Sequence, residues 1–320
     1  MKRRGPFVSW PTATHLFLLS CFGLACDDDD TVTAQTQSPN IANAPAMGGA
    51  GGRSGTSTGG GARAEGGAGS DFDAGAAVER NVFRPEERPV SAELVATLRV
   101  PSGFSISTYA SSVEDARMLV ARGPYVYVTR PQPGDVLRLE DRDGDGTAEA
   151  RATVASSLPL VHGIAFRGDQ VYLATPNEIL SASVDASGDF GEPAVIIDDL
   201  PDGGQHPLRT IGISPDDRLF ISVGSTCDAC PESNPENATL LVAELDGTAR
   251  RTYAKGLRNT IGFGWHPVTE RLWGMDHGSD WRGDDTPPEE LNAIADGNDY
   301  GWPYCYGDRR VDPVIQDPPD

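Results

Sequence analysis

A repeated pattern constrains the fold of this chain more than any other feature. A turn followed by a short strand centred on an aromatic residue occurs four times, at Tyr127, Tyr172, Phe220 and Trp273, which lie 45, 48 and 53 residues apart. A second short apolar segment precedes each turn, and a third often follows. This period is typical of the four-stranded blades of a β-propeller, whereas a β-sandwich would not explain the recurring aromatic residue. The sequence therefore predicts an all-β propeller.

The N-terminal residues predict export. Basic residues 2–4 precede an apolar run at residues 16–25, which is too short to span a bilayer and has the character of a secretory signal. Small residues before Cys26 form a box typical of bacterial lipoproteins, so we expect residues 1–26 to be a lipoprotein signal with Cys26 lipidated. A similar box ends at Cys21, and an ordinary signal peptide is the other alternative. We expect a periplasmic or cell-surface protein whose membrane contact is this lipid anchor.

A linker separates this signal from the repeat. Residues 27–89 include a stretch rich in Gly, Ser, Thr and Ala at residues 48–70, which cannot bury enough apolar surface to offset chain entropy. We expect a disordered tether there and a propeller domain over residues 90–320. The formal net charge of −21 argues against a nucleic-acid partner, because phosphate recognition requires a basic surface.

Polar residues precede two of the predicted inner strands. His206 and Arg209 come before the strand at residues 211–214, and Arg258 and Asn259 come before the strand at residues 261–265. The inner strands of a propeller line its central channel, so these four side chains can converge on one axial pocket. In the alternative interpretation the arginines pair with acidic neighbours and His206 only ends a loop.

Four longer motifs extend this pattern to a known family. They are LRVPSGFSISTYA, QHPLRTIGISPDDRLFISVGSTCDAC, YAKGLRNTIGFGWHPVTERLWGMDHG and PPEELNAIADGNDYGWPYCYG, and they lie between Leu98 and Gly307. Together they resemble the glucose/sorbosone dehydrogenase family. The resemblance implies a six-bladed propeller that uses pyrroloquinoline quinone (PQQ) and calcium to oxidise a sugar or aldehyde, with a further electron acceptor.

The resemblance also implies roles for individual residues. His206 matches the general base that takes a proton from the sugar hydroxyl, a role suited to an imidazole. Arg258 and Asn259 match the pair that contacts the quinone, and Arg209 is a further candidate for contact with the anionic cofactor. The active-site calcium would be held through backbone carbonyls around Gly283 and Asp284.

The length of the repeat region sets an expectation about completeness. Six blades of this period would need roughly 270 to 320 residues, more than residues 90–320 provide. We therefore expect an incomplete propeller of about four to five blades with unpaired blade edges. This leaves two other functions open: a non-catalytic, surface-tethered propeller that binds a glycan or protein, and a calcium-dependent hydrolase of the lactonase type.

Two acidic segments allow a structural or a metal-binding interpretation. Asp141, Asp143 and Asp145 match the first half of an EF-hand calcium loop, but Ala152 stands where the loop needs a glutamate, so a plain turn is the alternative. Thr286 and Glu289 form a capping box that predicts a short helix ending near Gly297.

The cysteines at positions 227 and 230 predict a disulfide. A redox motif of this spacing would need a helix N-terminus to lower the thiol pKa, and a zinc site would need further ligands. Neither accompanies the loop that follows FISVG. In an oxidising compartment we therefore expect Cys227 and Cys230 to be joined.

Overall fold

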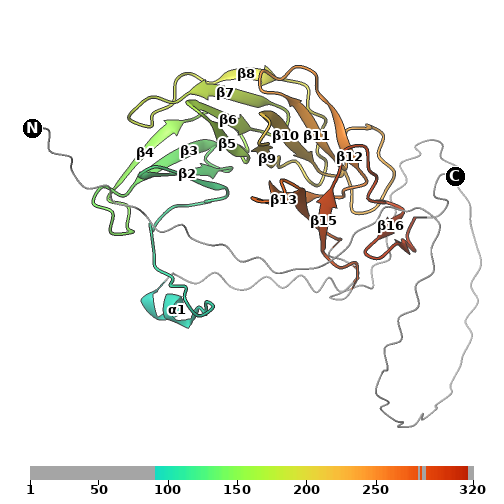
Figure 1. The fold of residues 1–320 in the computed structure, drawn as a ribbon, viewed down its shortest axis with the longest axis horizontal. Helices are drawn as coiled ribbons and strands as arrows, with labels where there is room; N and C mark the ends of the chain where they lie inside the picture. Colours follow the sequence, from blue (N-terminus) through green and yellow to red (C-terminus); the bar gives the residue numbers. More distant parts are fainter. Residues whose placement is uncertain (1–90, 280–281, 283–285, 316–320) are drawn as a thin grey trace, which may run out of the picture.

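The structure is a computed structural model that describes residues 91–279, 282 and 286–315. The predicted signal, the whole predicted linker at residues 27–89, Gly283 and Asp284 lie outside the described residues, and so do Cys21 and Cys26. The one helix described, α1 (Ala92–Thr97), is capped at its N-terminus by the Ser91 side chain. Figure 1 shows it apart from the sheets.

Four antiparallel sheets follow one another in chain order, and each pairs its strands in sequence. The first contains β1 (Leu119–Arg122), β2 (Tyr125–Arg130), β3 (Asp135–Glu140) and β4 (Ala150–Ala155). The second contains β5 (Ile164–Arg167), β6 (Gln170–Ala174), β7 (Ile179–Ser183) and β8 (Ala194–Ile197). The third contains β9 (Ile211–Ile213), β10 (Arg218–Val223), β11 (Thr239–Glu244) and β12 (Arg251–Lys255). The fourth contains β13 (Thr260–Trp265), β14 (Leu272–Asp276) and β15 (Glu290–Ile294).

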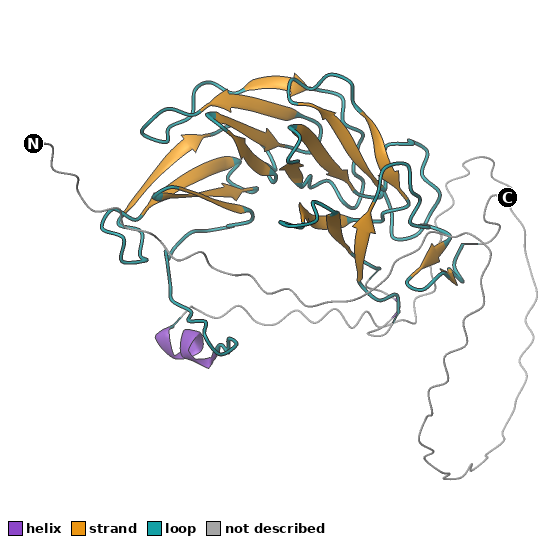
Figure 2. Ribbon diagram, viewed as in Figure 1, coloured by secondary structure: helices purple, strands orange, loops and turns teal. Residues whose placement is uncertain are grey.

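The four sheets are arranged as consecutive propeller blades. Figure 1 and Figure 2 show them fanned around a common centre as an open arc, with β5 and β9 toward the inside. A short hairpin of β16 (Cys305–Tyr306) and β17 (Arg310–Val311) follows the fourth blade. The predicted all-β propeller is confirmed, with four blades among the described residues.

The recurring aromatic residues pack between neighbouring blades. Tyr127 on β2 contacts Phe166 on β5, with ring centroids 4.8 Å apart, and Phe220 on β10 contacts Trp265 on β13 at 5.2 Å. Tyr127, Tyr172 and Phe220 are almost completely buried. Burial of a large apolar side chain stabilises a fold by about 1.5–3 kcal/mol. The repeat thus supplies one anchor for each of these blade interfaces.

Polar bonds also join the blades near their inner strands. The Thr129 hydroxyl donates to the carbonyl of His162 at 2.8 Å, and the Ser222 hydroxyl donates to the carbonyl of Thr260 at 2.6 Å. All four residues are buried. These bonds satisfy polar groups that water cannot reach, and they fix how each blade sits against the next.

The helix expected after Thr286 is a wrong prediction. Residues Glu290–Ile294 form β15, which pairs antiparallel with β14 from Leu272↔Ile294 to Asp276↔Glu290. A segment this short is a marginal helix by itself, so pairing with a neighbouring strand decides its conformation. Gly297 lies in the turn that follows, with a φ of 81°.

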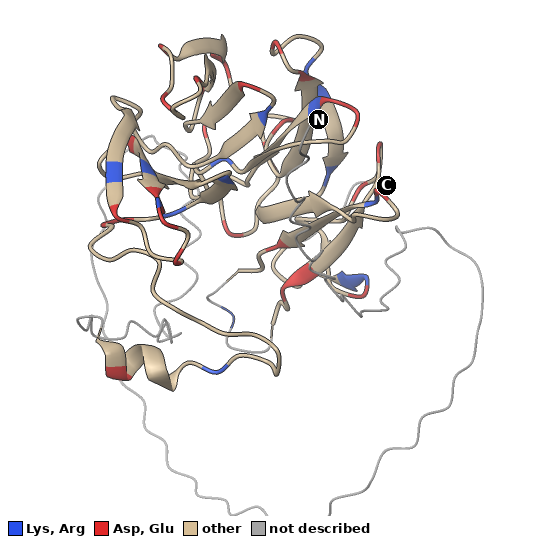
Figure 3. Cartoon of the chain, turned by 60° about the vertical axis from the view of Figure 1, so that its left-hand side comes forward, with Lys and Arg blue, Asp and Glu red and all other residues tan. Residues whose placement is uncertain are grey.

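Charged residues of both signs are spread over the described part of the chain. Figure 3 shows acidic residues in many of the loops, with basic residues scattered among them. In the described part of the chain, no helix is long and apolar enough to cross a membrane.

Candidate functional site

His206 lies in the β8–β9 connection with its ring oriented by Ser225. Its Nδ1 is 2.8 Å from the Ser225 carbonyl oxygen and 3.0 Å from Ser225 Oγ. The Ser225 hydroxyl donates its hydrogen to the carbonyl of Cys227 at 2.7 Å, so its oxygen can only accept from the histidine. Nδ1 therefore carries the proton, and Nε2 presents a lone pair.

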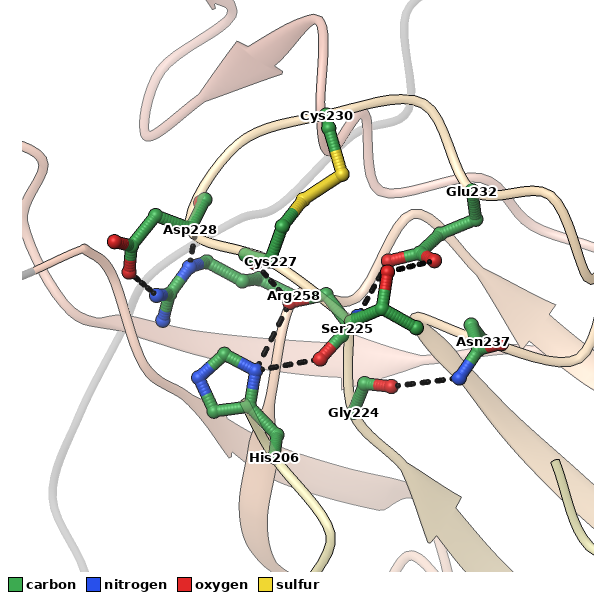
Figure 4. The surroundings of a disulfide bond; sticks show 10 residues. His206, Gly224, Ser225, Cys227, Asp228, Cys230, Glu232, Asn237 and Arg258 are labelled. Carbon is green, nitrogen blue, oxygen red and sulfur yellow. Dashed lines mark hydrogen bonds and ion pairs between the residues drawn. A yellow bond between two sulfur atoms is a disulfide. The ribbon is translucent and has the colours of Figure 1, made fainter. Parts of the chain in front are cut away.

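The surroundings of His206 favour the neutral imidazole. Burial lowers the pKa of His206 and the Arg258 guanidinium lowers it further, while the bond to Ser225 and the Asp228 carboxylate oppose these effects without reversing them. A neutral ring with a lone pair on Nε2 is the form of histidine that acts as a general base. Figure 4 shows Nε2 turned away from Ser225.

Arg258 is buried in the connection between β12 and β13, and four of its five N–H groups have partners in the structure. Nε donates to the Asp228 carbonyl at 3.0 Å, and Nη2 donates to the Asp228 carboxylate at 2.9 Å. Nη1 donates to the carbonyls of His277 and Gly278 at 3.1 and 2.7 Å. Among the described residues, one Nη2 hydrogen has no acceptor, so the guanidinium is held rigidly and keeps one donor for a ligand.

Asn259 is positioned by its backbone. The backbone N–H groups of Arg258 and Asn259 both donate to the Asp276 carboxylate at 2.9 Å, and the Thr260 hydroxyl donates to it at 3.0 Å. The structure gives no hydrogen bond to the half-buried side-chain amide of Asn259 from any described residue. That amide is therefore available to a ligand.

Asp276 is a functional-site residue that the sequence interpretation missed. It ends β14 and is fully buried, and burial together with Glu290 raises its pKa to about 7. The sequence does show an acidic residue at the end of a mostly apolar strand. It does not show that this residue accepts hydrogen bonds from the backbone of the segment GLRN.

Gly224 brings His206 and Asn259 together. A Cβ at this position would lie 2.5 Å from the Cβ of His206 and 2.9 Å from Oδ1 of Asn259. The two side chains therefore flank the same backbone atom, just after β10. His206, Arg258 and Asn259 form one cluster, as Ser225 also joins them by donating its N–H to the Arg258 carbonyl at 2.7 Å.

Arg209 has partners that differ from the predicted cofactor contact. Its side chain is completely buried and donates to the carbonyls of Pro176, His206 and Pro201 at 2.9, 3.1 and 2.6 Å. Burial lowers its pKa to about 10, so it remains a cation at neutral pH. These three bonds support the loop that carries His206.

A second buried histidine, His162, lies behind Arg209. Its Nε2 accepts from Arg117 Nε at 3.1 Å, so its Nδ1 carries the proton and donates to the Arg209 carbonyl at 3.0 Å. Burial lowers the pKa of His162. Both nitrogens are engaged, which makes this histidine a structural member of the polar network.

A pocket adjoins the cluster on the side of Arg258. Its lining combines the carboxyl groups of Asp228, Asp276 and Glu290 with the guanidinium groups of Arg258 and Arg282 and with aromatic and proline side chains. His206 and Asn259 do not line it. The oxygens beside Arg258 are already engaged, because the carbonyls of His277 and Gly278 and the carboxylate of Asp228 accept from its guanidinium.

The other predicted sites lie in loops. Asp141, Asp143 and Asp145 are in the β3–β4 connection, and their carboxylates lie within 4.8 Å of one another and of Glu149. Glu149 occupies the ninth position of the loop, where the sequence interpretation did not look for a carboxylate. Cys227 and Cys230 form a disulfide in the β10–β11 connection.

The fold and the cluster define a propeller with a polar site beside its inner strands. A family model described as TrAA12-like matches residues 98–316. The chain belongs to this family, and the resemblance to sugar dehydrogenases predicted from the sequence is confirmed.

Two curated proteins are similar in sequence. One is an uncharacterised protein of Borreliella burgdorferi, 25% identical over 67% of this chain and 59% of the relative. The other is a pyrroloquinoline quinone-dependent sugar dehydrogenase of Hypocrea jecorina, 25% identical over 53% of this chain and 48% of the relative. The chain therefore spans about half the length of these relatives.

Solved structures share the fold. The pyranose dehydrogenase PQQ domain from Coprinopsis cinerea, in its holo form, has a TM-score of 0.58 at 18% identity and covers 65% of this chain and 58% of that one. The calcium structure of the Trichoderma reesei family AA12 enzyme has a TM-score of 0.56 at 21% identity, over 62% and 57% of the two chains.

Proposed function

We propose that this protein oxidises an aldose or a related sugar or aldehyde, with PQQ and calcium as cofactors, at the cluster of His206, Arg258 and Asn259. The observation that carries this proposal is the tautomer of His206. Its proton is fixed on Nδ1 by Ser225, so a lone pair on Nε2 is available to a substrate hydroxyl. The relatives that act on sugars support the substrate class.

The described residues fit the quinone. PQQ is a carboxylated quinone, and the remaining N–H of Arg258 and the amide of Asn259 are donors suited to its oxygens. Calcium prefers oxygen ligands, and the backbone carbonyls around Gly283 and Asp284 are their proposed source. When bound, the quinone would supply the acceptor for the hydride of the substrate.

The residues of the chain would divide the remaining work. His206 Nε2 would take the proton of the hydroxyl that is oxidised, and Ser225 would accept a hydrogen bond from the imidazolium that results. Arg258 would stabilise negative charge on the bound cofactor, because its other four N–H groups hold it in place. Arg209 would keep the His206 backbone at a fixed position.

Reconstitution tests this proposal. Protein loaded with PQQ and calcium should reduce a dye in the presence of at least one aldose, and His206→Ala should slow single-turnover oxidation about 10²–10⁴-fold, the usual range for a positioned general base. Quinone affinity should be retained, since the imidazole acts on the substrate. Wild-type rates in His206→Ala would remove this residue from the mechanism.

The same experiment separates the two alternatives. Opening of a lactone without dye reduction would indicate a calcium-dependent hydrolase, and the acidic cluster at residues 141–149 is the observation that favours it. Activity in neither assay would favour a tethered propeller that binds a glycan or protein. We also propose that Asp141, Asp143 and Asp145 hold a structural calcium ion, with Glu149 as a fourth carboxylate.

A further inference from the structure

The loop that contains the disulfide contacts both functional side chains. Figure 4 shows the Cys227–Cys230 bond with His206, Ser225, Asp228 and Arg258 around it. This loop belongs to the β10–β11 connection, residues 224–238, in which the structure has no strand or helix. Its conformation therefore depends on a few backbone hydrogen bonds, on side-chain contacts and on the disulfide.

One branch of contacts leads to Arg258. Asp228, inside the disulfide ring, accepts from Arg258 with its carbonyl at 3.0 Å and with its carboxylate at 2.9 Å. Two acceptors from one residue define the direction of the guanidinium plane, because a charge-assisted pair of this kind is geometrically specific.

The other branch leads to His206. The Ser225 carbonyl lies in the same loop and accepts from His206 Nδ1 at 2.8 Å. The Cys227 carbonyl accepts the Ser225 hydroxyl hydrogen, so the hydroxyl oxygen also accepts from Nδ1. The Thr226 carbonyl also accepts the N–H of Gln205, next to His206, at 3.1 Å. Glu232 secures this part of the loop by accepting from the Thr226 N–H and hydroxyl at 2.7 Å.

We propose that the Cys227–Cys230 disulfide positions Arg258 through Asp228 and His206 through Ser225, and that its reduction to two thiols disables the site while the propeller stays folded. The consequence for catalysis rests on the proposed function. A dithiol supplies the two electrons and two protons: the S–S bond breaks, two S–H groups form, and the dithiol becomes a disulfide.

Two properties make the effect local. The disulfide closes a ring between residues three apart in the sequence, and cross-links over such short loops contribute little to global stability. Cys227 and Cys230 are only half-buried, and 45% of the Asp228 side-chain surface is exposed, so a reductant has access. Blade cores such as those of Tyr127 and Phe220 do not include the loop.

The test compares the full-length protein before and after reduction. Dithiothreitol is added and then removed by gel filtration under nitrogen, and imidazole ¹⁵N spectra report the tautomer of His206, assigned with His206→Gln. We expect the oxidised protein to show Nδ1–H and the reduced protein to lose this preference. Quinone affinity should fall about tenfold or more, as expected for loss of a charge-assisted contact, while the melting temperature changes by only a few degrees.

Two controls make the result specific. The double variant Cys227→Ser, Cys230→Ser should resemble the reduced protein. Dithiothreitol should not change it further, which would show that the remaining cysteines do not cause the effect. Asp228→Asn should weaken quinone binding, whereas Asp296→Asn, which removes a carboxylate paired with Arg251 on exposed strand ends, should not.

The outcomes also separate this inference from the proposed function. An unchanged His206 tautomer and unchanged quinone affinity after reduction would overturn the positioning role, and so would global unfolding on reduction. If the tautomer and quinone affinity change but the oxidised protein acts on no sugar, the positioning role stands and the proposed dehydrogenase activity fails.

Discussion

Gly224 leaves room for the two side chains that flank it, which gives a prediction at the scale of one residue. In Gly224→Ala the new Cβ would lie 2.5 Å from the His206 Cβ, closer than carbon atoms can approach. Since the contact is with the base of the side chain, His206 must move as a whole. We expect turnover to fall at least tenfold with only modest loss of stability, because a small shift of a catalytic group is enough to slow a reaction.

Steady-state kinetics and thermal unfolding check this prediction, and Gly264→Ala is the matched control. Gly264 lies on β13, where a Cβ would meet no atom within 4 Å. Equal losses of activity in the two variants would contradict a specific role for Gly224.

The sequence predicts which residues form the site better than it predicts which partners they contact. The cluster of His206, Arg258 and Asn259 could be predicted because each precedes an inner strand, and such positions share one end of the channel. The partners of Arg209 could not, because the three carbonyls that it contacts come from loops brought together only by blade packing. Asp276 was missed for another reason: it accepts from residues 258–260 at the start of the neighbouring strand, and a strand end alone does not show which groups it will bond.

At the scale of one strand, β14 ends on a buried carboxyl that should make stability depend on pH. Burial and Glu290 raise the pKa of Asp276 to about 7, while an unfolded aspartate titrates near about 3.9. Between these values the folded state binds more protons than the unfolded state. The free energy of unfolding should therefore contain a component that falls as pH rises from about 4 to 7, by at most about 1.4 kcal/mol per unit.

Two histidines change the free energy of unfolding with pH in the opposite direction. The effect of Asp276 must therefore be measured as the difference between the parent and a variant. Burial lowers the pKa values of His162 and His206, and their stabilisation is lost as pH falls below about 6.5. Urea unfolding of the parent and of Asp276→Asn, with a chelator present, should show a gap that varies with pH between 4 and 7. The same gap at every pH would show that Asp276 titrates normally.

The sequence predicted most of the strands correctly but was wrong about β15. The aromatic period predicted the blades correctly, because the same interface between blades selects a large residue at the same place. Residues 290–294 were predicted as helix from a capping box, yet they form β15. Local capping signals contribute about 1 kcal/mol, and pairing with β14 along five residues outweighs them.

At the scale of the whole molecule, the blades follow one another along an arc, as Figure 1 shows, and the cluster joins the third blade to the fourth. Inner-strand neighbours create the site: His206 precedes β9, and Arg258 and Asn259 precede β13. The site therefore depends on the docking of the third blade against the fourth, through Phe220 and Trp265 and through the bond from Ser222 to Thr260. Loss of that interface would separate the proposed base from the proposed cofactor contacts.

The attachment of the molecule to a membrane gives the last prediction. We propose that Cys26 is lipidated after export and that residues 27–89 hold the propeller away from the bilayer, because a flexible chain of about 60 residues spans roughly 45 Å. Cys26→Ser should then move the protein from the membrane fraction to the soluble fraction, since it removes the proposed lipid chains. Fractionation followed by immunoblotting measures this, with Cys21→Ser as the matched control. Release by Cys21→Ser instead would identify the other cysteine as the lipidated one, and membrane association of a variant that lacks both cysteines would rule out a lipid anchor at either position.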